Sequence, residues 1–489
     1  MRATNDHTES WTAMASASDS TTADVIVLGM GPGGEQVATD ALAGGLTVIG
    51  IEAELVGGEC PYWGCIPSKM AIRGATVLQE SRRIEALSGT AQQQPDWSLV
   101  AARIRSEATD NWDDQVAVDR FLGNGGTFVR GYGKLTGPRT VVVGEIEYTA
   151  TRALVIGAGT KASIPPIAGL AEVPYWTNRE ALRTETVPTS LVVLGGGAIG
   201  CELAQTFSRF GSSVTVVEAA PRLIAHEEPE AAVALLSAFE REGITVITGV
   251  GASKVSVAEH EGLPGVRVDL ADGTAVCAAV VLVATGRRTE LTKFNSAAIG
   301  IDPTQSRALR TNDFLEVVDD SGSTVPGVYA VGDVAGKGAF THVAVAQGRM
   351  IADQLLGRRT ASWSSRSVGH VTFTDPEVGA VGLTEHDART AGLNVVTASY
   401  PMASTTRGWI HGEGNDGLFK LIVDHARGVI VGGTVVGPHA GEVLAGLTVA
   451  VAGGVPVQRL IETVWAYPTY HRGFDAVLAE LPDDLRSGR

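Results

Sequence analysis

The chain has 489 residues, a net charge of −16 and 44% hydrophobic residues. This length suggests about three domains and is sufficient to bury large cores. Lys and Arg are not concentrated in any stretch, so a surface that follows nucleic-acid phosphates is not expected. The chain contains no run of about 18 uninterrupted apolar residues, so no membrane-spanning helix is expected either.

Residues 1–23 are rich in Ser, Thr and Ala and contain no apolar run that resembles a signal-peptide core. We expect them to form a disordered leader, or to reflect a start site placed too early. The chain has only four cysteines, which are Cys60, Cys65, Cys201 and Cys277. That number is too small for a secreted disulfide scaffold, so the close pair indicates redox or metal chemistry in the reducing cytoplasm.

The first predicted element is an apolar strand over 24–28, which runs into a glycine-rich turn over 29–34. A helical pattern follows, and then a strand over 46–51 ends at an acid. In a dinucleotide-binding turn, the three glycines allow the tight turn, the approach of a pyrophosphate and close helix packing, while the acid accepts hydrogen bonds from ribose. These roles are predicted for Gly29, Gly31, Gly34 and Glu52.

The same order of elements recurs over 190–218, with a strand, a glycine-rich turn, a helix, a second strand and an acid. The corresponding residues are Gly195, Gly197, Gly200 and Glu218. A single such turn is often an ordinary loop, but two complete copies predict two bound dinucleotides. An acid at Glu218 repels a 2′-phosphate, so NADH is expected in preference to NADPH; Arg222 nearby leaves NADPH possible.

Between the first copy and the later elements lies the segment 57–69, which reads Gly-Gly-Glu-Cys-Pro-Tyr-Trp-Gly-Cys-Ile-Pro-Ser-Lys. Cys60 and Cys65 would not face each other on a regular helix, so a bond between them must distort the first turn and be readily reduced. A helix N-terminus also favours the thiolate. Taken alone, the pair would more simply be two inert core cysteines. No second Cys/His pair has ligand spacing, so no metal site is predicted.

This segment strongly resembles the redox motif of the class I pyridine nucleotide–disulfide oxidoreductases, a family that includes dihydrolipoamide dehydrogenase, glutathione reductase, mercuric reductase and soluble transhydrogenase. The resemblance covers nearly the whole chain from Asp24 onward. Residues 198–202 look like the helix of the second nucleotide, and Gly332-Asp333 is similar to the segment that binds the flavin ribityl chain. Residues 371–377 and 436–442 resemble the C-terminal dimerisation domain.

The resemblance implies an α/β fold with two Rossmann-like domains, for FAD and NAD, and a C-terminal α+β dimerisation domain. The expected boundaries are a leader over 1–23, an FAD domain over 24–157 and 284–363, an NAD(P) domain over 158–283, and a dimerisation domain over 364–489. The protein would then be a homodimer that uses FAD and NADH and passes electrons to a small-molecule acceptor.

The resemblance also implies residue roles. Cys65 would lie against the flavin, Cys60 would exchange with the substrate, and Lys69 would pair with Glu202 near the flavin. In the absence of the motif, Lys69 and Glu202 would be ordinary surface charges. Cys201 and Cys277 are expected to be small apolar core residues. Further cofactor contacts are expected at Gly58, Gly133, Gly159, Ile199, Gly286, Asp333 and Thr341.

The chain departs from the family near its C-terminus. Disulfide-reducing members carry His-Pro-Thr followed by Glu, and the His of the partner subunit moves protons for the substrate. Here Tyr467 takes the place of the His and Arg472 that of the Glu. A phenol is a poor base at neutral pH and Arg cannot accept a proton. His471 is one possible substitute, although its helical phase differs from that of Tyr467, and both Tyr467 and His471 are kept as candidate catalytic residues.

The leading hypothesis is therefore a disulfide oxidoreductase whose acceptor does not need the His–Glu pair. Soluble transhydrogenase shares Tyr-Pro-Thr but lacks the cysteine pair, and mercuric reductase typically adds a C-terminal cysteine pair that is absent here. A quinone reductase, diaphorase or transhydrogenase-like enzyme that uses the flavin directly is the main alternative. A non-catalytic flavoprotein subunit is the alternative from a different class.

Overall fold

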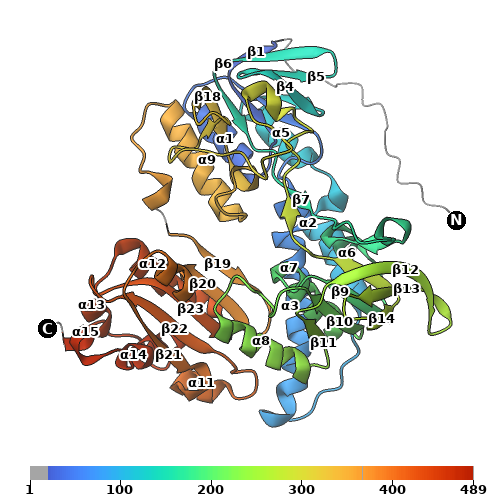
Figure 1. Cartoon of the computed structure of the whole chain (residues 1–489), viewed down its shortest axis with the longest axis vertical. Coiled ribbons are helices and arrows are strands. Elements are labelled where there is room, and N and C mark those ends of the chain that lie inside the picture. The colour runs from blue at the N-terminus through green and yellow to red at the C-terminus, as the bar shows by residue number, and fades with distance from the viewer. Residues whose placement is uncertain (1–19, 366, 488–489) are drawn as a thin grey trace. The chain divides into compact units, whose positions relative to one another are not determined.

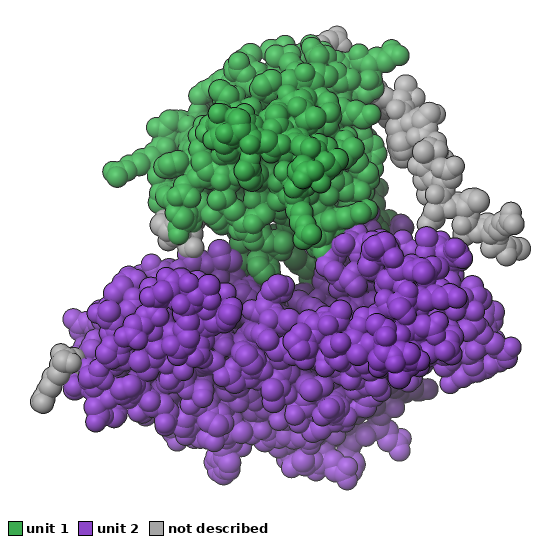
Figure 2. All heavy atoms as spheres, viewed as in Figure 1, with its two compact units in different colours: residues 1–65, 108–161, 287–365 green, residues 66–107, 162–286, 366–489 purple. Residues whose placement is uncertain are grey.

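The computed structural model describes residues 20–365 and 367–487. The chain divides into two compact units, which Figure 2 colours separately. Unit 1 is built from the described parts of Met1–Cys65, Ala108–Lys161 and Arg287–Ser365, and unit 2 from those of Ile66–Glu107, Ala162–Gly286 and Arg366–Arg489. Among the described residues, none of the helices combines the length and the apolar character that crossing a membrane requires.

Unit 1 is organised around an eight-stranded sheet. Its central strands pair in the order β18-β6-β1-β2-β3, all parallel, while β17 and the hairpin β4–β5 are antiparallel additions. The strands are β1 (Thr22–Leu28), β2 (Val48–Glu52), β3 (Thr127–Arg130), β4 (Gly133–Gly137), β5 (Thr140–Val143), β6 (Ile146–Ile156), β17 (Glu316–Val318) and β18 (Thr324–Ala330). The central strands are buried apolar runs, as expected where both faces of a parallel sheet are covered.

The helices of unit 1 are α1 (Pro32–Ala43), α2 (Glu59–Trp63), α5 (Gln115–Gly123) and α9 (Thr341–Leu355). Helices α1 and α9 lie side by side (Figure 1), because each presents a glycine to the other. A Cβ on Gly348 would come within 2.7 Å of Gly33 O, and one on Gly33 within 3.1 Å of Ala344 O. Helix α9, whose N-terminal residue is Thr341, is therefore packed against the helix that follows the first glycine-rich turn.

Unit 2 contains three further sheets. The first is parallel, in the order β11-β10-β9-β15-β8, and the other two are antiparallel, β12-β13-β14 and β19-β20-β23-β22-β21. The strands of the parallel sheet are β8 (Tyr175–Trp176), β9 (Ser190–Leu194), β10 (Ser213–Glu218), β11 (Thr245–Thr248) and β15 (Val280–Val283). The antiparallel strands are β12 (Ala252–His260), β13 (Leu263–Leu270), β14 (Ala275–Ala278), β19 (Gly369–Thr372), β20 (Glu377–Gly382), β21 (Val395–Pro401), β22 (Leu418–Asp424) and β23 (Val429–Gly437).

The helices of unit 2 belong to three chain segments. They are α3 (Cys65–Arg82), α4 (Trp97–Arg103), α6 (Asn178–Arg183), α7 (Ala198–Arg209), α8 (Pro229–Arg241), α10 (Glu385–Thr390), α11 (Thr406–His411), α12 (Ala440–Gly453), α13 (Val457–Ile461), α14 (Gly473–Ala479) and α15 (Asp483–Ser487). Leu444 and Leu447 of α12 are buried with Phe419 and Leu421 of the last sheet in one apolar core. Two short strands, β7 (Lys161–Ala162) and β16 (Arg287–Arg288), lie where the chain passes between units.

The structure corrects the expected start of the ordered chain. Strand β1 begins at Thr22, because Thr22 and Ala23 pair with Thr149 and Ala150 of β6. The end of the expected leader is therefore part of a sheet, while its residues 1–19 lie outside the described residues. The second nucleotide sheet and the C-terminal sheet both lie in unit 2, and the three expected domain boundaries stay a prediction.

Candidate active site

The first glycine-rich turn has the geometry of a dinucleotide-binding turn. Gly29 has φ +97°, and a Cβ there would lie 2.4 Å from Gly157 O. A Cβ on Gly34 would lie 2.1 Å from Gly29 O, so helix α1 leaves no room for a side chain. At Gly31, by contrast, a Cβ would meet nothing within 4 Å. This open position leaves backbone accessible to a pyrophosphate, at a helix N-terminus without a side-chain cap.

The second turn repeats this geometry in unit 2. Gly195 has φ +107°, and its Cβ would lie 2.4 Å from Ala284 O. A Cβ on Gly200 would lie 2.0 Å from Gly195 O, whereas Gly197 again faces open space. The two turns therefore fit the same kind of ligand, which agrees with the expectation of two dinucleotides.

The acid that ends the second strand of each copy is anchored by backbone. Glu52 accepts hydrogen bonds of 2.8 Å from Met30 N and 2.8 Å from Glu54 N, and burial raises its pKa. Glu218 accepts bonds of 2.6 Å from Gly196 N and Ala220 N. A carboxylate oxygen has two lone pairs, so each acid is oriented by the turn and retains capacity for ribose hydroxyls.

Arg222 had left the nucleotide preference open. Its guanidinium donates to two backbone carbonyls, Ala225 O at 2.7 Å and Glu227 O at 3.0 Å. The side chain is therefore engaged by the loop that follows it, and the acidic Glu218 remains the charged residue at the end of β10.

Cys60 and Cys65 lie on two consecutive helices, not on one. Helix α2 ends at Trp63, and Gly64, with φ −135° and ψ −114°, breaks the helical path before α3 begins at Cys65. The helical path is thus broken between the two cysteines, while the bond from which a distortion was predicted stays a prediction. Cys65 Sγ lies 3.3 Å from Thr341 Oγ1, the first residue of α9. As the first residue of an 18-residue helix, Cys65 is placed where a thiolate is favoured.

Lys69 and Glu202, which lie 133 positions apart, form an ion pair. Lys69 Nζ is 2.8 Å from Glu202 Oε2, and Glu202 is only 6% exposed. The structure adds a third member that the sequence did not reveal. Phe373 N donates to Glu202 Oε1 at 2.8 Å, and the Phe373 ring centroid lies 4.7 Å from Lys69 Nζ. The carboxylate is therefore held by one side-chain cation and one backbone amide.

Asp333 lies in unit 1, after strand β18. Its Oδ2 accepts a hydrogen bond of 2.6 Å from Thr160 Oγ1, and Arg287 Nε lies 3.9 Å from the same oxygen. Arg287 also approaches Glu59 of α2, at 3.4 Å. Arg287 thereby links Asp333 to the helix that carries Cys60. Neither Thr160 nor Arg287 was singled out from the sequence.

The other glycines expected at the cofactors fall into two groups. Gly159 and Gly286 have positive φ, at +63° and +111°, and face open space. Gly58 packs against the first turn, where its Cβ would lie 3.1 Å from Gly31 Cα. Gly133 lies in β4, where a Cβ would meet Leu28 Cδ1 at 2.6 Å, so packing in the sheet already requires a glycine there. Its contact with a cofactor stays a prediction, as does that of Ile199 at the start of α7.

The C-terminal segment shows what replaces the His–Glu pair. Tyr467 is 67% exposed, and the Arg472 guanidinium lies 5.6 Å from its ring centroid. Arg472 also pairs with Asp475 at 2.8 Å. His471 instead stacks on Trp465, with ring centroids 6.4 Å apart. In this chain, His471 and Tyr467 thus pack against different neighbours.

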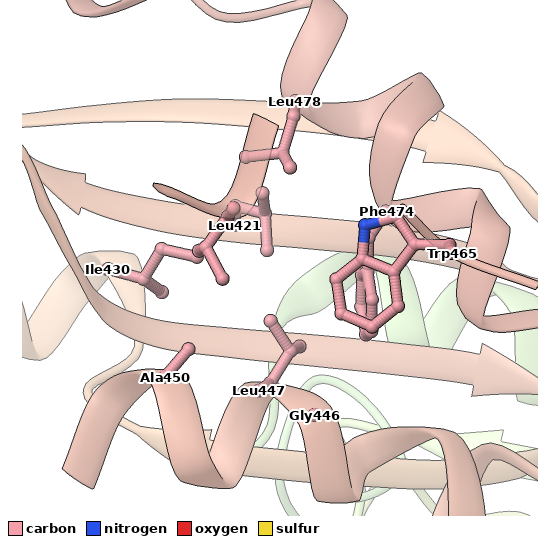
Figure 3. Close-up of a pocket in the computed structure, with 9 residues that line it drawn as sticks. Leu421, Ile430, Gly446, Leu447, Ala450, Trp465, Phe474 and Leu478 are labelled. Carbon is pink, nitrogen blue, oxygen red and sulfur yellow. The ribbon is translucent and has the colours of Figure 1, made fainter. Parts of the chain in front are cut away.

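Trp465 also borders the pocket drawn in Figure 3. This pocket lies in the C-terminal core of unit 2, and its lining is apolar: Leu421, Ile430, Gly446, Leu447, Ala450, Leu460, Trp465, Phe474 and Leu478. None of the predicted site residues lines it. The pocket therefore belongs to the packing of the C-terminal domain.

The two remaining cysteines differ. Cys201 is fully buried on α7, and burial together with Glu202 and Glu218 raises the pKa of its thiol. Cys277 is exposed on β14, so the prediction that it is a core residue was wrong. Position 277 lies in a three-stranded antiparallel sheet, in which alternate side chains point away from the core.

Residues 23–348 match the family model described as pyridine nucleotide-disulphide oxidoreductase, and residues 368–477 match its dimerisation domain. Dihydrolipoyl dehydrogenase of Thermus scotoductus is 33% identical over 472 residues, covering 92% of this chain and 96% of the relative. Mercuric reductase of Shewanella putrefaciens is 30% identical over 476 residues, covering 95% of this chain and 82% of the relative.

Solved structures agree on the fold. LpdA from Mycobacterium tuberculosis superimposes with a TM-score of 0.80 at 24% identity, covering 93% of this chain and 98% of that one. The flavoprotein disulfide reductase RclA from Escherichia coli gives 0.79 at 22% identity, with 94% and 100% covered. The predicted fold class, two dinucleotide-binding domains followed by an α+β dimerisation domain, is confirmed. The chain belongs to the FAD-dependent pyridine nucleotide-disulphide oxidoreductase family.

Proposed function

We propose that this protein moves two electrons from NADH through FAD to a redox-active disulfide of Cys60 and Cys65, and from there to a small acceptor. The observation that carries this proposal is the placement of Cys65 at the first residue of α3, with its sulfur 3.3 Å from Thr341 Oγ1 in the unit that holds the first glycine-rich turn. When bound, FAD would supply a carrier that takes hydride from the nicotinamide and gives electrons to sulfur.

The chain's own residues have separable tasks. The turn at Gly29–Gly34 and Glu52 would bind FAD in unit 1, and the turn at Gly195–Gly200 would bind NADH in unit 2. Lys69 follows Cys65 by four residues on α3, and its ion pair with Glu202 would balance charge as electrons arrive. Cys60, on the other side of the Gly64 break, would exchange with the acceptor.

The preference for NADH rests on Glu218, whose carboxylate is fixed by two backbone amides. A 2′-phosphate beside this carboxylate would place like charges together. Comparing kcat/KM for NADH and NADPH tests the preference. Glu218→Ala should raise kcat/KM for NADPH, so the ratio of the NADH value to the NADPH value should fall. Comparable wild-type values for the two nucleotides would contradict it.

The acceptor is proposed to be one that does not need a histidine base. Tyr467 and Arg472 occupy the positions of the family's His and Glu, and neither group is a base at neutral pH. Relatives bear the names dihydrolipoyl dehydrogenase and mercuric reductase. Disulfides, quinones and mercuric ion therefore form the panel of acceptors to compare.

A homodimer is proposed because the C-terminal part presents apolar side chains to solvent. The exposed ones there include Trp409, Ile410, Val449, Ile461 and Val464. Large apolar side chains left exposed in this way are typical of an interface with another chain. All five lie in the segment that matches the family's dimerisation domain.

Anaerobic titration of the FAD-loaded enzyme with NADH tests the central claim. Two electrons should produce a long-wavelength absorbance band that reports a thiolate beside the flavin. Cys60→Ser should abolish the reduction of disulfide acceptors while flavin reduction by NADH persists. If the Cys60→Ser enzyme reduces disulfides at the wild-type rate, the proposed role of the pair is wrong.

A second candidate function is direct reduction of quinones or another nucleotide by the flavin, as in a diaphorase or a transhydrogenase. The exposed Tyr467 with Arg472 against its ring favours this alternative, because these two residues do not form the His–Glu pair that disulfide-reducing members of the family use. The same Cys60→Ser variant separates the two candidates. Direct flavin chemistry predicts that quinone reduction survives the substitution at the wild-type rate.

A further inference from the structure

Three consecutive residues that are not glycine adopt the left-handed conformation in unit 1. Asp110, Asn111 and Trp112 have φ of 46°, 56° and 59°. This conformation disfavours L-residues at each position, and it persists only where surrounding contacts hold it in place. The side chains that such a turn places are therefore candidates for a specific structural role.

The turn carries Trp112 onto helix α2, which contains Cys60. The Trp112 and Trp63 rings stack, with centroids 5.6 Å apart and planes 21° apart. Trp112 Nε1 donates a hydrogen bond of 3.2 Å to Tyr62 O. Tyr62 is in the last turn of α2, where carbonyls lack intrahelical partners. The indole thus caps the C-terminal end of α2, immediately before the Gly64 break.

The segment leading into α2 is held by neighbouring residues. Val56 N donates to Asp114 Oδ2 at 2.6 Å, and Asp114 is fixed by Arg130 NH2 at 2.6 Å. Gly57 N donates to Met30 O at 2.7 Å, which ties the same segment to the first glycine-rich turn. Helix α2 is therefore anchored before its start by the turn and Asp114, and at its end by Trp112.

We propose that Trp112 is a positioning residue for the cysteine couple, and that the left-handed turn exists to place it. By fixing the end of α2, Trp112 restrains the position of Cys60 relative to Cys65, which begins α3 directly after the Gly64 break. This inference rests on the proposed redox role of the pair and goes beyond it, because it names the residue that sets how strongly the disulfide form is favoured.

The reaction that reports this role is thiol–disulfide exchange. Two molecules of glutathione reduce the Cys60–Cys65 bond: two enzyme thiols form, and one glutathione disulfide takes up the oxidised sulfurs. Loosening α2 lowers the effective concentration of one thiol at the other. The equilibrium should then move toward the dithiol.

The experiment equilibrates FAD-loaded enzyme, without oxygen, in buffers of stepped glutathione to glutathione-disulfide ratio, and traps free thiols for mass spectrometry. Trp112→Phe keeps a ring for the stack but loses the N–H donor, and Trp112→Ala loses both. The dithiol fraction should rise in both variants. The equilibrium constant for reduction of the bond by glutathione should increase about three-fold in Trp112→Phe, which loses one net hydrogen bond, and about five-fold or more in Trp112→Ala, which also loses the ring contact.

Two further variants serve as controls. Trp97→Phe removes an indole that donates to Thr184 O at 2.9 Å in unit 2, and it should leave the equilibrium unchanged. Asn111→Gly should also match wild type, because glycine accepts the left-handed turn and Trp112 stays in place. Flavin content and melting temperature establish that each variant is folded.

The outcomes separate this inference from the proposed function. If wild-type enzyme forms no bond between Cys60 and Cys65 in any buffer, the proposed function fails. If the wild-type bond forms and both Trp112 variants titrate with wild type, only the positioning role is overturned. A shift shared equally by Trp97→Phe would also overturn it.

Discussion

At the scale of single residues, Glu202 is held by more than the predicted ion pair. The Lys69 ammonium and the Phe373 amide bind different oxygens of one carboxylate, and the ammonium also lies over the Phe373 ring. A charged group fixed in this way cannot rotate without losing two bonds. The negative charge of Glu202, and not only its shape, is therefore expected to matter.

Glu202→Gln tests that charge. The amide oxygen can still accept from Phe373 N, but Lys69 loses its anionic partner. Stopped-flow measurement should show flavin reduction by NADH slowed about ten-fold or more, since hydrogen bonds to charged groups are the stronger ones. Glu228→Gln is the matched control, because Glu228 pairs with the buried Lys420 at 2.8 Å in the same unit. Glu228→Gln should lower the melting temperature and leave the rate of flavin reduction unchanged. Equal rates of flavin reduction in the Glu202→Gln and Glu228→Gln variants would refute the prediction.

Tyr467 and Arg472 permit a gain-of-function test. The double variant Tyr467→His with Arg472→Glu rebuilds the family's acid–base pair. Since general acid–base help is worth about 10²–10⁴-fold, NAD+-linked oxidation of dihydrolipoamide should rise by about 10²-fold over wild type. Tyr467→Phe with Arg472→Met supplies the control that alters both residues without adding a base. A double variant no faster than this control would show that another feature limits this reaction.

At the scale of elements, helix α2 is short but strongly constrained. It has five residues, yet Trp112 and Arg287 contact it, and Met30 accepts a hydrogen bond from Gly57 in its leading segment. Burial, followed by the nearby Asp114, Glu35 and Asp113, raises the pKa of Tyr62 on this helix to about 12. The phenol therefore reports on the integrity of α2.

The sign of the resulting pH dependence follows from linkage. An unfolded tyrosine loses its proton near pH 10, whereas Tyr62 in the native protein retains it to about 12. Native protein binds the extra proton in this window, so its stability should fall as the pH rises from about 10 to about 12. Tyr62→Phe should lose less stability there in urea unfolding. Alkaline absorbance of wild type minus this variant should show a midpoint near 12, and a midpoint near 10 would contradict the burial argument.

At the scale of the whole molecule, the exposed apolar side chains of the C-terminal part are the feature that a dimer would cover. Val464 is 95% exposed and Val449 is 69% exposed. In a single chain these two side chains stay in water, so they contribute no stability through burial. Covering such side chains against a second copy would supply the missing apolar contact.

Val464→Glu is therefore expected to convert dimers to monomers. A glutamate at this position costs nothing in an exposed monomer but would be desolvated within an interface. Light scattering coupled to size exclusion should give half the wild-type mass. Val257→Glu is the matched control, since Val257 is 68% exposed on β12, outside the C-terminal segment, and its mass should equal that of wild type. A wild-type monomer would contradict the proposal itself.

The sequence by itself determined the two nucleotide turns and their acids. These are local features: Gly29 and Gly34 act on backbone a few residues away or on the neighbouring strand, so spacing alone identifies them. The break at Gly64 between the two cysteines came from the structure. The lysine–glutamate pair was reached only through the family resemblance, because its members lie 133 positions apart.

Only the tertiary structure decided which distant side chains complete the site. Phe373 lies 171 positions from Glu202, and Trp112 lies 50 positions from Tyr62 and reaches it through a left-handed turn that no composition signal marks. The exposure of Cys277 and the extension of β1 to Thr22 likewise depend on which strands pair. Contacts of this kind depend on how distant segments are brought together by the chain topology. A short stretch of sequence does not specify that topology.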